Sequence, residues 1–183
     1  RACCSALRAS SGLNSPPRRS KLHLEFAYTG TGDFTPWLTV PAALDVMADL
    51  APAGDGWAGV RAANLNLLLT GRRILCEALD IEPPAPESML GSLCTLILPQ
   101  HPPALQARLR ERPTRYHDAL WDALHQGWGI QVPVMYLPQL DASAADKPAA
   151  RFLRISAQLY NSDDQYRYLA VAVAAELERE RGL

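Results

Sequence analysis

Two short stretches of the chain carry residue types that could bind an anionic ligand. The first is Tyr28–Asp33, in which Gly30 and Gly32 flank Thr31. Glycines beside a hydroxyl residue let successive backbone N–H groups converge, and such a nest binds phosphate-like anions. The second is Arg154, whose planar guanidinium can hold a carboxylate through two parallel hydrogen bonds. The alternatives are an ordinary turn for the first stretch and, for the second, a surface arginine that pairs with an acid.

Several common catalytic motifs are absent from the sequence. It contains no P-loop, no H-E-x-x-H metal motif and no G-x-S-x-G nucleophile motif. The cysteines form no C-x-x-C pair, so we expect free thiols in a reducing compartment, the cytoplasm. The sequence by itself therefore indicates no metal site and no catalytic residue.

Composition indicates a globular protein and argues against two classes of partner. The chain has 183 residues, of which 48% are hydrophobic and 20% charged, enough for one domain or slightly more. A net charge of −1 argues against a nucleic-acid partner, although the first 24 residues hold five basic and no acidic residues. No apolar run approaches the ~20 residues that a membrane span requires, so we expect no membrane partner and no secretory signal.

Helical periodicity predicts two helices in the first part of the chain. Thr39 and Pro41 are suited to begin one helix, which Pro52 ends. A longer helix is expected over residues 58–79, because its apolar residues recur on one stripe. Residues 8–23 are polar and rich in turn residues, and they predict a loop or a divergent arm. The Pro83-Pro84-Ala85-Pro86 stretch predicts a domain boundary between residues 1–82 and 83–183.

The second part of the chain predicts a βαββα order. Strands are expected over residues 93–98, 131–136 and 152–158, with a helix that opens at Thr114 and that Gly127 ends. Ser162 begins a capping box that opens the last helix. The predicted fold class is α/β, a short sheet with helices on one face. In the third strand, alternation places Arg154 on the face opposite Leu153 and Ile155.

Five segments, taken in order, resemble the class V aminotransferase family. They look most like its isopenicillin N epimerase-like and cysteine desulfhydrase-like branch, and the resemblance covers about residues 24–175. The last of the five segments is the most specific. They are Gly30–Asp33 (Gly-Thr-x-Asp), Pro41–Leu44, Ser88–Pro99, Gly129–Val134 and Leu153–Ser162.

The resemblance implies a cofactor, a partner and a role for three residues. The family's enzymes are dimers of fold type I that bind pyridoxal 5′-phosphate (PLP). By resemblance, Gly30 and Thr31 would hold the PLP phosphate of the other subunit, and Arg154 would bind the α-carboxylate of an amino-acid substrate. Residues 1–82 would then be the end of the large PLP-binding domain, followed by the small α/β domain.

One departure from the family's pattern concerns the lysine that carries PLP. That lysine precedes Gly-Thr-x-Asp in the family, whereas Lys21 and Lys147 are the only lysines here and neither has a matching context. We therefore expect that the chain begins after that lysine and carries part of an active site. The resemblance does not distinguish an epimerase from a C–S lyase or an aminotransferase. The alternatives are a non-catalytic truncated chain that acts as an interaction or dimerisation module, and a stand-alone α/β domain that binds small anions.

Overall fold

The computed structural model describes residues 20, 22, 26, 30, 32–52, 54–136 and 150–183. The chain divides into two compact units, Arg1–Asp45 and Val46–Leu183. The sheet and the helices that pack on it belong to the second unit. Of the expected loop or arm at 8–23, only Ser20 and Leu22 are among the described residues.

Two helices follow one another between residues 35 and 49. Helix α3 spans Thr35–Leu38, and the Oδ1 atom of Asp33 accepts the first backbone N–H of the helix at 2.9 Å. Helix α4 spans Val40–Asp49, with Pro41 in its first turn, as the sequence predicts. Proline is tolerated there because the first N–H groups of a helix have no partner within it.

Helix α5 spans Gly56–Leu79 and agrees with the predicted helix over 58–79. Its buried side chains recur at helical spacing, from Val60 through Leu68 to Leu75. The helix ends at Asp80, which has a φ of 51° and donates its backbone N–H to the carbonyl of Cys76. Such a left-handed residue is a common helix terminator, and the prolines that follow cannot extend the helix.

The sheet has three antiparallel strands in the order β1-β3-β2. Strand β1 spans Leu93–Ile97, β2 spans Val134–Tyr136 and β3 spans Arg151–Ser156. Strands β1 and β2 lie within the predicted strands. Strand β3 begins at Arg151, one residue before its predicted start, and ends within the predicted range. The mixed α/β class predicted from the sequence is thereby confirmed.

The helices after β1 differ from the prediction. The order is βααββα rather than βαββα, because helix α6, Pro103–Glu111, was not predicted. Only Gln106 and Leu109 of α6 are buried, so the segment lacks a continuous apolar stripe. Helix α7 spans Ala119–Trp128 and begins five residues after the predicted Thr114. The Asp122 carboxylate accepts the N–H groups of residues 115 and 116, at 2.7 and 2.9 Å, and holds a turn there instead.

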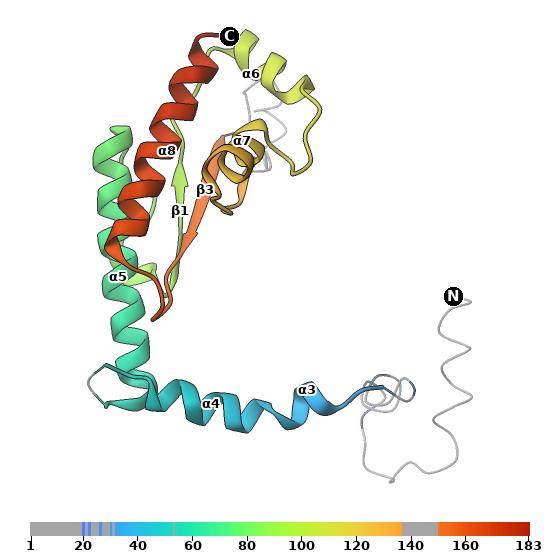
Figure 1. Cartoon of the computed structure of the whole chain (residues 1–183), viewed down its shortest axis with the longest axis vertical. Helices are drawn as coiled ribbons and strands as arrows, with labels where there is room; N and C mark the ends of the chain where they lie inside the picture. Colours follow the sequence, from blue (N-terminus) through green and yellow to red (C-terminus); the bar gives the residue numbers. More distant parts are fainter. Residues whose placement is uncertain are drawn as a thin grey trace. The chain divides into compact units, whose positions relative to one another are not determined.

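The last helix, α8, spans Asp163–Arg181 and begins with the predicted capping box. It lies beside α5, and the two helices contact each other along the sheet (Figure 1). Helix α7 also packs on α8.

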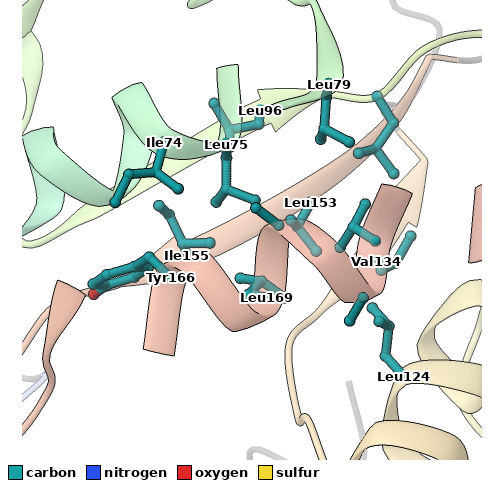
Figure 2. Close-up of a cluster of buried hydrophobic side chains, with 14 of the residues drawn as sticks. Ile74, Leu75, Leu79, Leu96, Leu124, Val134, Leu153, Ile155, Tyr166 and Leu169 are labelled. Carbon is teal, nitrogen blue, oxygen red and sulfur yellow. The ribbon is translucent and has the colours of Figure 1, made fainter. Parts of the chain in front are cut away.

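One hydrophobic core joins these helices to one face of the sheet (Figure 2). The inward side chains of the strands include Leu96, Val134, Leu153 and Ile155, all at most 2% exposed. Burial of one such side chain contributes about 1.5–3 kcal/mol relative to its exposed state. The helical residues of the core labelled in Figure 2 are Ile74, Leu75 and Leu79 of α5, Leu124 of α7, and Tyr166 and Leu169 of α8.

The predicted boundary after residue 82 concerns the two domains of a longer enzyme and remains a prediction. In this chain, α5 packs on β1 and β3 and is part of the same compact unit as the sheet. Glu87–Met89 forms a single 3₁₀ turn, η1, between α5 and β1.

Candidate functional site

Arg154 lies on the central strand, on the face away from the core. Its neighbours Leu153 and Ile155 are 0% and 2% exposed, whereas Arg154 is exposed. Successive side chains of a strand point to opposite faces, so burial of its two neighbours forces the guanidinium outward. The orientation predicted from the sequence is therefore confirmed.

The backbone of Arg154 is held from both sides. In the register of the sheet it lies opposite Thr95 of β1, and its N–H donates to the Pro133 carbonyl at 3.1 Å. Among the described residues, no carboxylate lies within ion-pair distance of its guanidinium. The alternative was a surface arginine that pairs with an acid, and the described part of the chain provides no such acid for Arg154.

Arg154 is one of the residues that line a cavity of about 460 Å³. Its walls are residues 129–133, the outer part of β3 around Arg154, and residues at the start of α8. Polar side chains in the wall include Gln131, Tyr160 and Gln165. The lining therefore includes one arginine and several hydrogen-bonding groups, a composition that suits a small ligand with a carboxylate, such as an amino acid.

A local hydrogen-bond network fixes the wall of this cavity at the start of α8. The Oδ1 atom of Asn161 accepts the Gln158 N–H at 3.0 Å, and its Nδ2 atom donates to Gln165 Oε1 at 2.9 Å. Gln165 Oε1 also accepts the Ser162 N–H at 3.2 Å, which completes the capping box. Because Oε1 is engaged twice, the amide nitrogen of Gln165 is the part of this side chain that remains to contact a ligand.

The predicted phosphate turn is only partly described. Gly30 is exposed and has a φ of 135°, a backbone conformation that residues other than glycine rarely adopt. The role of this turn in phosphate binding remains a prediction. Thr31 and both lysines lie outside the described residues. Gly30 belongs to the unit Arg1–Asp45 and Arg154 to the unit Val46–Leu183, so each predicted contact is described by itself.

Two further kinds of site are not found among residues 20–52, 54–136 and 150–183, as far as the structure describes them. No group of three or more histidine, cysteine or acidic side chains there could hold a metal ion. No helix in the same residues is long and apolar enough to cross a membrane.

A buried ion network supports β3 on the core-facing side of the sheet, opposite to the face on which Arg154 lies. Arg151 is 4% exposed; its Nε donates to Asp118 Oδ2 at 2.9 Å and its Nη1 to Glu180 Oε2 at 2.7 Å. The Nε2 atom of His101 lies 2.9 Å from the same oxygen of Glu180. Asp118 also accepts the Leu120 N–H at 2.8 Å and thereby caps α7. The network joins α7, β3, α8 and the segment after β1.

Charge pairing sets the protonation of this network. Burial alone would raise the pKa of Glu180, but the hydrogen bonds and the positive charge of Arg151, together with His101, outweigh it and lower the pKa below its ordinary value. The pKa of Arg151 is raised: burial acts to lower it, but the two carboxylates stabilise its charge more strongly. With its donors satisfied inside the protein, Arg151 is a structural residue, in contrast to Arg154 three positions later.

The sequence patterns did not indicate this network or a second buried arginine, Arg72. Arg72 is 7% exposed and lies on the buried stripe of α5, four residues after Leu68 and three before Leu75. Arg151 likewise has the same parity in β3 as Leu153 and Ile155. In both cases the sequence has a charged residue at an inward position of an apolar pattern, and this could have indicated a buried charge.

Comparison with known proteins finds partial matches to two isopenicillin N epimerases. The protein from Streptomyces clavuligerus is 28% identical over 166 residues, which are 89% of this chain and 33% of that protein. The protein from Amycolatopsis lactamdurans is 32% identical over 144 residues, 79% of this chain and 30% of that protein. No protein-family model matches the sequence. The chain spans about a third of the length of these curated relatives, and the matches support a distant relationship to PLP-dependent class V proteins.

Proposed function

We propose that this chain is the C-terminal part of a PLP-dependent enzyme that acts at the Cα atom of an amino acid. The observation that carries the proposal is Arg154, which is exposed, has no acid partner among the described residues and belongs to the lining of a cavity of about 460 Å³. The distant relationship to isopenicillin N epimerases supports the same assignment. When bound, PLP supplies an electron sink that stabilises negative charge at Cα. The proposal covers epimerisation, C–S bond cleavage and transamination, which share this requirement.

In this proposal, each predicted residue has one physical role. Arg154 binds and orients the α-carboxylate through two parallel hydrogen bonds. The backbone around Gly30 and the hydroxyl of Thr31 hold the phosphate of PLP, and a second copy of the protein completes the site. We assign no catalytic residue within the chain, and we propose a cytoplasmic location.

The role of Arg154 can be tested by carboxylate binding to the 183-residue chain itself. The isotope-labelled chain is titrated with L-valine and with L-valinamide, which lacks the carboxylate, while amide resonances are followed by NMR. We expect saturable shifts around residues 129–133 and 154–165 with valine only. Arg154→Lys should weaken valine binding about tenfold or more, because an ammonium group cannot donate two parallel hydrogen bonds in a fixed plane.

A matched control is Arg167→Ala, which removes another exposed arginine, on α8, that does not line the cavity. It should leave the affinity for valine unchanged. Equal binding of valine and valinamide, or an Arg154→Lys variant with the affinity of the parent chain, would contradict the proposal. Circular dichroism of both variants checks that the fold is retained.

A second candidate function is an interaction or dimerisation module. It is favoured by apolar side chains on α3 and α4 that the described residues leave uncovered, above all Trp37 and Leu38, which are 74% and 77% exposed. Large exposed apolar side chains that are adjacent in the sequence are typical of a contact surface. The partner in this reading is a second copy of the chain.

Sedimentation equilibrium tests the second candidate. The chain should self-associate, and the double substitution Trp37→Ser with Leu38→Ser should shift it toward the monomer. Leu183→Ser is the control, since Leu183 is also exposed, at 54%, but lies at the other end of the sequence. A dimer that binds no carboxylate would favour the module over the enzyme, and a stable monomer would exclude the module.

A further inference from the structure

A second cavity adjoins Arg154 at the edge of the sheet. It measures about 360 Å³, and the residues that line it include Leu90, Leu93 and Thr95 around β1 together with Arg72 and Arg154. Arg154 also lines the first cavity, so the two cavities have this residue in common. The second cavity thus has two arginines in its wall.

Arg72 is held in a position that leaves donors available. Its side chain is 8% exposed; Nη1 donates to the Ala85 carbonyl at 2.8 Å and Nη2 to Glu87 Oε1 at 3.0 Å. A guanidinium has five N–H donors, and the described residues provide acceptors for two of them. A buried cation requires an anionic partner, because burial of an unpaired charge is costly.

The partner that Arg72 has in this structure is itself mostly exposed. The side chain of Glu87 is 67% exposed and belongs to the single 3₁₀ turn η1. An exposed acid loses little on turning into water, because water solvates a carboxylate well and exposed ion pairs are weak. A carboxylate from a ligand could therefore replace Glu87 at Arg72 at small cost, while Arg72 keeps its bond to Ala85.

We propose that Arg72 and Arg154 form a two-carboxylate site that selects dicarboxylic amino acids. Arg154 binds the α-carboxylate, and Arg72 binds the side-chain carboxylate in the place that Glu87 occupies here. The inference rests on the proposed function and narrows its substrate class. Without a ligand, Glu87 neutralises Arg72 and keeps the turn at 85–87 closed on α5.

The test compares acidic amino acids with their neutral isosteres. The labelled 183-residue chain is titrated with L-glutamate against L-glutamine, and with L-aspartate against L-asparagine. The acid of at least one pair should bind about tenfold more tightly than its amide, as expected for one additional charge-assisted hydrogen bond. Glu87→Gln should increase this preference, because it removes the competing carboxylate from an exposed position and leaves Arg72 in place.

Two arginine variants complete the test. Arg72→Gln should abolish the preference for the acid and leave the amide's affinity unchanged. Arg73→Gln is the control, because Arg73 is exposed, pairs with Glu77 and does not line this cavity. If Arg72→Gln does not fold, Glu87→Gln decides the question.

Two results would overturn the inference: no acid preference in the parent chain, or a preference that Glu87→Gln fails to increase. L-valine separates this inference from the function on which it rests. Normal valine binding without an acid preference would refute the second carboxylate site alone. A parent chain that does not bind valine would refute the role of Arg154 and the two-carboxylate site together.

Discussion

Replacement of Arg151 should destabilise the chain more than replacement of any exposed arginine. Arg151, Asp118 and Glu180 have side chains that are 4%, 1% and 7% exposed. In Arg151→Ala both carboxylates remain buried without the guanidinium, although Glu180 keeps its contact with His101. Loss of one partner from a buried ion pair typically costs about 3–5 kcal/mol, largely because the remaining charge is uncompensated. Since a domain of this size has only about 5–15 kcal/mol of stability, we expect the loss to be severe.

The measurement is the free energy of unfolding from urea titrations at pH 7, followed by circular dichroism. The matched control is Arg181→Ala, which breaks the exposed pair with Glu178 on α8 and should cost at most about 1 kcal/mol. If Arg151→Ala does not fold, Asp118→Asn is the milder variant, since it keeps the cap of α7 and removes one charge.

A rescue experiment tests the cause of the effect. If the uncompensated carboxylates are responsible, Asp118→Asn with Glu180→Gln in the Arg151→Met background should restore part of the lost stability. A loss in Arg151→Ala that equals that in Arg181→Ala would refute the reasoning, because it would show that the two carboxylates are solvated without Arg151.

Three further predictions concern other buried groups. Because the pKa of Glu180 is lowered on folding, its charge stabilises the folded state above the ordinary pKa of 4.5. This contribution is lost as the pH falls through the folded-state pKa. Glu180→Gln should therefore flatten the dependence of the unfolding free energy on pH below 4.5. In Gly71→Ala the new Cβ would lie 2.7 Å from the Tyr166 ring, so we expect a loss of about 1–3 kcal/mol in urea titrations, whereas Gly127→Ala enters open space on α7 and should be neutral or stabilising. Burial raises the pKa of the Cys94 thiol to about 11, so iodoacetamide at pH 8 should leave Cys94 unmodified in the native chain and label it in urea, as read by mass spectrometry; rapid native labelling would contradict this.

The sequence by itself determined those features that depend on neighbours along the chain. The apolar stripe of α5, the capping box of α8 and the alternation in β3 are local patterns, and the structure has all three where they were predicted. Alternation also oriented Arg154, because burial of Leu153 and Ile155 leaves only one face for the residue between them. The signal is strong in such cases because each pattern repeats the period of the element that it forms.

Only the tertiary structure decided which charged side chains are buried and what they contact. Arg151 meets Asp118 and Glu180 across separations of 33 and 29 residues, and no local pattern encodes such a pairing. The start of α7 depended on the same kind of contact, because the Asp122 carboxylate holds a turn where periodicity predicted helix. Arg72 is likewise one of several arginines in the sequence until packing buries it beside a cavity. Burial is a property of all surrounding elements together, and it determines whether an arginine supports the fold or remains available to a ligand.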